Sequence, residues 1–159
     1  MSELTTNMGR GVISGAVATV ALSLLMVIGS ALPQLMHAQL LNNLVHGVLE
    51  HYGLEAFPLA GWIWHFLIGT LWWGSLFAVV EPILPGRTPG RKGISFGAGC
   101  GFVVLVALIP LAAAGAFGME LSFLTVVVTA LQHLAYGYVL GEVYGRLSPS
   151  MAPTLHGTG

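Results

Sequence analysis

The sequence predicts an all-α integral membrane protein with four membrane-spanning helices, arranged as two hairpins in a bundle, and a fifth helix on the outer surface. Three observations lead to this prediction. Of the 159 residues, 55% are apolar and only 7% are charged, with a mean hydropathy of +0.85, whereas soluble domains carry about 25% charged residues. Long apolar runs recur four times along the chain. The basic residues all fall in segments that would lie on one side of the bilayer.

Each of the four apolar runs is long enough to cross a bilayer. A hydrocarbon core of about 30 Å requires roughly 20 helical residues, and lipid leaves helices as the only structure for continuous runs of this length. The expected helices cover about 11–32, 59–81, 93–115 and 120–145. They form one membrane domain, residues 1–146, with a kink expected at Pro110. We expect the small, polar tail 147–159 to be disordered in the cytoplasm.

The long connection between the first two spans is expected to form an interfacial helix over about 34–52. Its apolar and polar residues separate with a helical period. It is too short and too polar to span, so we expect its apolar face to rest on the outer surface of the bilayer. His46 and Glu50 are four residues apart on the polar face and are candidate ligands for one metal ion. The alternative is that they only form the wetted face of an interfacial helix.

The distribution of basic residues predicts the orientation of the chain. Cytoplasmic loops of membrane proteins carry an excess of Lys and Arg. The connections 33–58 and 115–120 contain neither residue. The five basic residues are Arg10, Arg87, Arg91, Lys92 and Arg146. Both termini, and the connection between the second and third helices, are therefore expected on the cytoplasmic side of the membrane.

Two stretches of the chain resemble each other and suggest a repeated two-helix unit. Residues 9–16 read GRGVISGA and residues 90–98 read GRKGISFGA. The motif His-x-x-x-Gly also occurs twice, at His65 and at His133. Two spans return the chain to its starting side, so the units would be parallel and related by an axis along the membrane normal. Short motifs also match by chance, and a true duplication is one of two interpretations.

Small residues recur at every fourth position in three of the expected helices. Such rows let helix backbones approach closely, which matters because lipid supplies no hydrophobic drive between helices. The rows are Gly11, Gly15, Thr19 and Ser23; Gly93, Gly97 and Gly101; and Gly137, Gly141 and Gly145. We expect them to face the interior of the bundle. The alternative is a contact with a neighbouring subunit.

Two histidines are expected within the bilayer. His65 lies 16 residues before Glu81, and His133 lies 13 residues before Arg146. At 1.5 Å per residue these separations correspond to about 24 and 20 Å, so the two side chains should lie at similar depths. An ionisable residue at membrane depth is a candidate for a functional role.

The first interpretation of this pair is a bis-histidine haem b site. Haem iron accepts axial imidazoles, and helix bundles hold cofactors between facing helices. Gly69 and Gly137, one turn from the histidines, would leave room for the porphyrin. The alternative is that each neutral imidazole bonds to a carbonyl or hydroxyl group of a neighbouring helix. Ser14, Thr19, Thr70 and Thr129 could supply such partners.

Several classes of function lack support in the sequence. The formal net charge is −1, whereas nucleic-acid binding requires a basic face. A single cysteine, Cys100, cannot form a disulfide within the chain or a cysteine-based metal site. There is no glycine-rich phosphate loop, no Ser/His/Asp arrangement and no Cys/His cluster. We therefore expect a protein that is not an enzyme.

Glycines open the odd helices, His-x-x-x-Gly occurs in the even ones, and Gly-x-x-x-Gly closes the last. In these features the chain resembles uncharacterised bacterial four-helix inner-membrane families, the domains of unknown function, over about 9–146. The resemblance implies a multi-pass protein of a bacterial inner membrane and no known activity. We expect a non-catalytic accessory subunit that packs, within the lipid bilayer, against other membrane protein subunits of a larger assembly. The alternatives are a haem b- or quinone-linked redox protein using His65 and His133, and a small-solute channel or transporter.

Overall fold

The computed structural model describes residues 3–30, 59–108 and 123–148, and all regular structure within these ranges is helical. The first helix is α1 (Glu3–Ser30). The second, which we call helix 2, is continuous and consists of α3 (Ala60–Leu67), the π-helical segment η1 (Ile68–Trp73) and α4 (Gly74–Val80). A 3₁₀ turn, η2 (Glu81–Ile83), follows it. The remaining elements are α5 (Pro89–Val103) with its π-helical end η3 (Val104–Leu108), and α7 (Phe123–Leu147).

The helical fold class is as predicted, and the membrane character is supported by three helices. Stretches of these three helices are long and apolar enough to cross a membrane, namely Thr5–Ile28, Ala60–Ile83 and Val126–Leu147. The expected interfacial helix, with His46 and Glu50, lies outside the described residues. So do Pro110, the expected end of the third helix and the expected start of the fourth, and almost all of the C-terminal tail.

Two helices begin earlier than the apolar runs indicated. α1 begins at Glu3 rather than near residue 11, and within its polar first turns the Arg10 guanidinium donates to Asn7 Oδ1 at 2.9 Å. α5 begins at Pro89 rather than at residue 93, because Thr88 caps it by accepting the backbone N–H of Arg91 at 3.3 Å. Proline at the first helical position has no N–H to leave unbonded. Hydropathy marks the lipid-crossing part of a helix, whereas capping residues mark its ends.

α5 lies along α7 with their backbones in direct contact. A Cβ atom built on Gly93 would clash with the carbonyl oxygen of Gly137, and one built on Gly97 would clash with that of His133. A Cβ atom on Gly141 would clash with the carbonyl oxygen of Pro89. Only glycine permits this approach, and the close contacts extend from Pro89 to Gly101 on α5 and from His133 to Gly145 on α7.

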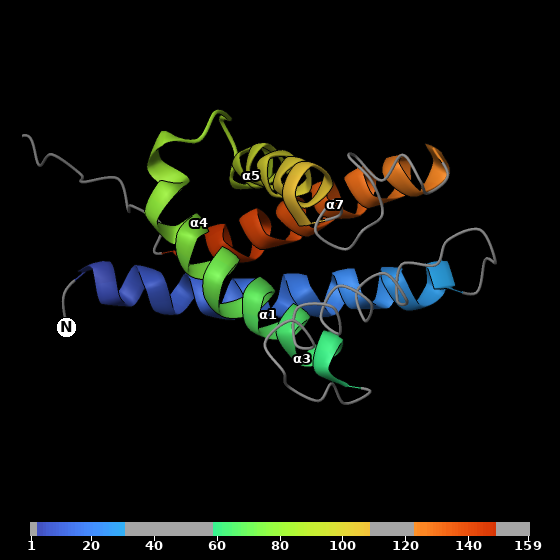
Figure 1. Ribbon diagram of the computed structural model, residues 1–159. Coiled ribbons are helices and arrows are strands. Elements are labelled where there is room, and N and C mark those ends of the chain that lie inside the picture. The colour runs from blue at the N-terminus through green and yellow to red at the C-terminus, as the bar shows by residue number, and fades with distance from the viewer. Residues whose placement is uncertain (1–2, 31–58, 109–122, 149–159) are drawn as a thin grey trace, which may run out of the picture.

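α1 and helix 2 cross through a second glycine contact (Figure 1). A Cβ atom on Gly11 would clash with the carbonyl oxygen of Gly74, and one on Gly15 would lie 2.8 Å from that of Thr70. In the contact between α1 and helix 2, Gly74 therefore has the position that Gly137 has in the contact between α5 and α7. The repeated His-x-x-x-Gly motif instead aligns Gly69 with Gly137. The glycines aligned by the motif therefore do not make equivalent helix contacts. A duplication of the two-helix unit stays a prediction.

The two helix pairs are joined mainly by α1 and α7, which lie side by side and run in opposite directions (Figure 1). An aromatic cluster fills the space between them and their neighbours. Phe77 of α4 meets Phe96 of α5 at a ring-centroid distance of 5.2 Å and Tyr144 of α7 at 5.3 Å, edge to face in both cases. Such rings pack against one another with specific geometry and high density. This aromatic cluster therefore packs helix 2, α5 and α7 against one another.

Charged residues gather at the end of the molecule where α1 begins and α7 ends. Lys92 Nζ and Glu81 Oε1 form an ion pair at 2.7 Å, which links the start of α5 to η2, the turn that follows helix 2. Arg10 and Glu81 both lie within electrostatic reach of Tyr144 near the end of α7. The gathering of these groups at one end agrees with the predicted one-sided distribution, while the side of the membrane stays a prediction.

Candidate functional site

A buried hydrogen bond joins α7 to helix 2 in the interior of the protein. The hydroxyl of Tyr136, which is only 3% exposed, donates to the carbonyl oxygen of Gly69 at 2.7 Å. Gly69 belongs to the π-helical segment η1, where the regular backbone ladder is interrupted. The hydroxyl of Thr19 on α1 also reaches Tyr136. Polar groups of three helices, α1, helix 2 and α7, therefore lie together at this position in an otherwise apolar protein.

The buried hydroxyl groups of α1 are satisfied within their own helix. Ser14, Thr19 and Ser23 each donate to the carbonyl oxygen four residues earlier, at 2.7, 2.7 and 2.8 Å. This back-bonding is the usual arrangement for Ser and Thr inside a helix. Ser14 and Thr19 therefore use their protons on α1, and neither forms the predicted bond to an imidazole.

His133 is also bonded within its own helix. Its Nδ1 lies 2.8 Å from the carbonyl oxygen of Thr129, one turn earlier on α7. Because a carbonyl oxygen only accepts, Nδ1 must carry the proton, and in the neutral ring Nε2 then holds the lone pair. The alternative interpretation of the sequence placed this bond on a neighbouring helix. The partner in the structure is one of the predicted residues, Thr129. The accepting group is its backbone carbonyl, and Thr129 lies on α7 itself rather than on a neighbouring helix.

His65 differs from His133 in its bonding. Its Nε2 is buried, and no group in the described part of the chain forms a hydrogen bond with it. The ring lies edge to face between Trp62 and Phe66, with centroid distances of 6.0 Å to each. The two imidazoles are close enough for a charge on one to act on the other. The side chain of His133 itself lies against α5, where its Cβ and Cγ atoms are 3.1 and 3.5 Å from a Cβ atom built on Gly101.

The glycines proposed to clear room for a porphyrin do not do so. A Cβ atom on Gly69 would clash with Oγ1 of Thr19, and one on Gly137 would clash with the carbonyl oxygen of Gly93. Both positions are filled by a neighbouring helix. Their lack of a side chain is explained by close helix packing, and the expectation of a haem face at these two glycines is wrong.

The structure adds residues that the sequence did not single out as a site. Tyr136 and Gln132 of α7 are buried, with 3% and 7% exposed, and so is Cys100 of α5. Cys100 lies within electrostatic reach of Tyr136. The signal was present in the spacing, because His133, Tyr136 and Leu140 follow at intervals of three and four and so share one helix face.

Replacing Tyr136 with phenylalanine should weaken the protein moderately. The change removes one interhelical hydrogen bond and keeps the ring, and such bonds in membrane proteins contribute about 0.6 to 1.7 kcal/mol. The midpoint of denaturation in a detergent mixture, followed by circular dichroism, measures the loss. Tyr138→Phe is the matched control, since Tyr138 lies on the same helix and is 50% exposed. Equal effects of the two changes would contradict the assigned bond.

Comparison with known proteins gives a family and no activity. No curated protein and no solved structure matches the chain. A family described as a family of unknown function, DUF6789, matches residues 5–154, which covers all of the described helices from Thr5 onward. The match confirms the resemblance to a domain of unknown function. The chain belongs to the DUF6789 family.

Proposed function

We propose that the protein is a non-catalytic subunit of a larger membrane assembly and that it packs against its partner through helix 2. In this proposal the chain is a four-helix bundle in a bacterial inner membrane, with both termini in the cytoplasm. The glycine rows are used up in contacts within the chain, between α1 and helix 2 and between α5 and α7. A contact with another subunit must therefore use a different surface.

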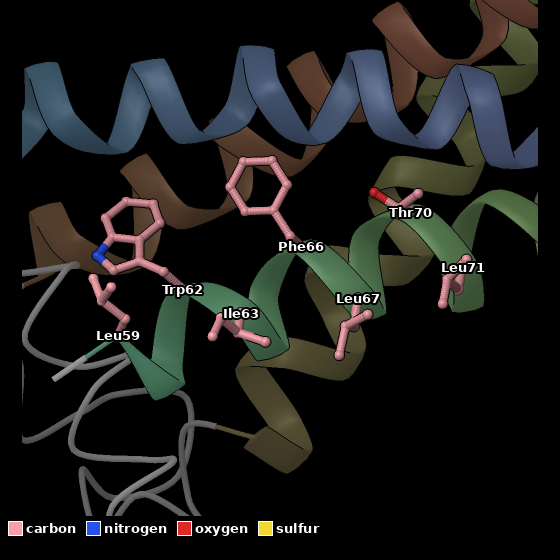
Figure 2. Close-up of a pocket in the computed structure, with 7 residues that line it drawn as sticks. All are labelled: Leu59, Trp62, Ile63, Phe66, Leu67, Thr70 and Leu71. Atoms are coloured by element: carbon pink, nitrogen blue, oxygen red, sulfur yellow. The ribbon is translucent and has the colours of Figure 1, made fainter. Parts of the chain in front are cut away.

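The observation that carries the proposal is an apolar groove along α3 and η1 (Figure 2). Its volume is about 430 Å³. Trp62 and Phe66 point toward α1 on one side, and Ile63 and Leu67 lie along the other. The seven lining residues are Leu59, Trp62, Ile63, Phe66, Leu67, Thr70 and Leu71. Ridges and grooves of large side chains are the features through which helices pack against one another.

Helix 2 is also the least buried of the three long apolar helices. In its most apolar stretch 22% of the residues are buried, against 44% in α1. Two tryptophans, Trp64 and Trp72, are 48% and 65% exposed on it. Aromatic side chains contribute most to packing between proteins because each brings a large, rigid area. A transmembrane helix of a partner would bury this surface without disturbing the contacts inside the chain.

Filling the groove should release the protein from its assembly. Leu67→Trp places a bulky apolar side chain in the groove without adding charge, so the change is tolerated by lipid. We expect the wild-type chain, extracted in mild detergent, to migrate in a complex on a native gel. We expect the Leu67→Trp variant to migrate largely as the free chain.

Leu24→Trp supplies the matched control for this experiment. Leu24 lies on α1, is 59% exposed, and does not line the groove, while Leu67 is 42% exposed. The control variant should remain in the complex. A wild-type protein that migrates alone, or two variants that behave alike, would contradict the proposal.

A further inference from the structure

We propose that the loop between η2 and α5, residues 84–88, forms with the first turn of α5 a binding site for the headgroup of an anionic phospholipid, held by Arg87 and Arg91. The site goes beyond the proposed subunit role, because it uses the membrane placement of the chain and no partner helix. The loop lies at the top of Figure 1, away from α1 and from the apolar groove of α3 and η1. Three features support this site: the shape of the loop, the pairing of its charges, and its place at the end of an apolar helix.

The loop is folded tightly onto the first turns of α5. Gly86 has a φ of +140°, a conformation that favours glycine, and a Cβ atom built on it would lie 3.0 Å from the Cβ atom of Arg91. The hydroxyl of Ser95 donates to the carbonyl oxygen of Pro85 at 2.9 Å, which holds the other side of the turn against the helix. Arg87, the residue after Gly86, therefore starts beside Arg91, and the two guanidinium groups extend from one fixed piece of backbone.

Two of the three basic side chains in this region have no acidic partner. Lys92 is neutralised by Glu81, with Nζ and Oε1 2.7 Å apart. Arg87 and Arg91 are exposed, and neither forms an ion pair with any described residue. The carboxylate of Glu142 also reaches the first turn of α5, yet within the described helices it is not paired with either arginine. The loop therefore presents two positive charges to a ligand.

The two arginines come directly after an apolar helix. The stretch of helix 2 and η2 that is long and apolar enough to cross a membrane ends at Ile83, four residues before Arg87. Ile83 is 83% exposed, so in a bilayer its side chain would contact acyl chains. The headgroup layers lie just outside a hydrocarbon core of about 30 Å and extend the bilayer to about 40–45 Å. The loop thus places guanidinium groups at the depth of the lipid phosphates.

An anionic phospholipid matches both the charge and the apolar surface of this region. A guanidinium group binds phosphate oxygens through two parallel hydrogen bonds. A zwitterionic headgroup brings a positive charge of its own next to the two arginines, whereas an anionic headgroup does not. A free phosphate ion would accept the same hydrogen bonds, but only a lipid also covers the apolar side chain of Ile83.

The test uses the purified full chain in a neutral detergent, with phosphatidylglycerol and phosphatidylcholine added in equal amounts and the retained lipids counted by native mass spectrometry. We expect the wild type to retain phosphatidylglycerol in preference to phosphatidylcholine. Arg87→Gln and Arg91→Gln should each lower this preference about fivefold, which is the effect of one basic residue at an anionic surface. The double variant should show no preference. Both side chains are exposed, so unchanged circular dichroism spectra are expected for all three variants.

Arg10→Gln is the matched control for the loss of one positive charge. Arg10 lies on α1, and its guanidinium already donates to Asn7 Oδ1 at 2.9 Å, so this variant should keep the preference for phosphatidylglycerol. Equal losses in Arg10→Gln and in the loop variants, or a wild type without any preference, would overturn the proposal. Glycerol 3-phosphate carries the phosphate without acyl chains and should not displace the retained lipid. Displacement by an equal concentration of glycerol 3-phosphate would instead assign the loop to a soluble phosphate compound and overturn the lipid site.

Discussion

Replacing Gly137 with alanine should destabilise the protein by about 1–3 kcal/mol, which is the usual range for overpacking a close-packed interior. The added methyl group would meet the carbonyl oxygen of Gly93, and it would lie 2.8 Å from both the Cα atom and the nitrogen of Gly97. These are backbone atoms and cannot rotate away. α5 and α7 must therefore move apart, and the loss of contact extends beyond the substituted position. The loss occurs even though alanine favours helix formation over glycine by about 1 kcal/mol.

Gly99→Ala is the matched control for this prediction. Gly99 lies on α5 like Gly93 and Gly97, but a Cβ atom at this position would meet nothing within 4 Å. The same chemical change should therefore leave stability unchanged or raise it slightly. Denaturation of each variant in mixed detergent, followed by circular dichroism, gives the comparison. Equal midpoints for Gly137→Ala and Gly99→Ala would mean that the close contact of α5 with α7 does not stabilise the protein.

The two glycines also show how far the sequence predicts the fold. Composition and apolar runs are properties of the whole chain, and they predict an all-helical protein correctly. Spacing by four identifies rows of small residues, but it does not reveal which helix each row meets. Gly93 meets Gly137, whereas Gly11 meets Gly74, which belongs to no row in the sequence. The partner depends on crossing angle and register, and these are set by all the helices together.

The π-helical segments were not predicted for a related reason. η1 and η3 consist almost entirely of apolar residues, and Thr70 is the only polar side chain among them. The helix propensities of these residues do not favour the wider turn that distinguishes a π-helix from an α-helix. The widening in η1 coincides with the contact to Thr19 and Tyr136, so tertiary packing accounts for it better than the local sequence does.

The candidate site was half predictable from the sequence. His65 and His133 stand out because ionisable groups are rare in apolar helices, and residue counting places them at similar depths. The role of Gly69 and Gly137 was wrong because a missing side chain signals a close neighbour without saying whether that neighbour is a cofactor or a helix. The orphan Nε2 of His65 and the intrahelical bond of His133 depend on side-chain rotamers, which no sequence pattern specifies.

Replacing Phe77 with alanine should cost about 3–5 kcal/mol, the range for emptying a fully buried aromatic position. Phe77 has no exposed surface, and its ring packs edge to face on Phe96 and Tyr144. The side chain therefore contacts α5 and α7 from helix 2. In lipid the hydrophobic contribution of the ring is weaker than in water. The substitution still removes the dispersion contacts of the ring, and helix association in membranes depends on such contacts. Loss of this one ring should separate helix 2 from the other two helices before α5 separates from α7.

Trp72→Ala tests whether the cost comes from packing or from apolar area alone. Trp72 lies on helix 2 only five positions before Phe77 and is 65% exposed, so its replacement removes a larger side chain but opens no cavity. Its effect on the denaturation midpoint should be small, within about 0.5 kcal/mol as for other exposed positions. Phe77→Leu should fall between the two, because leucine refills part of the space. If Trp72→Ala costs as much as Phe77→Ala, then removal of apolar area governs stability, and the aromatic cluster does not hold helix 2 to α5 and α7.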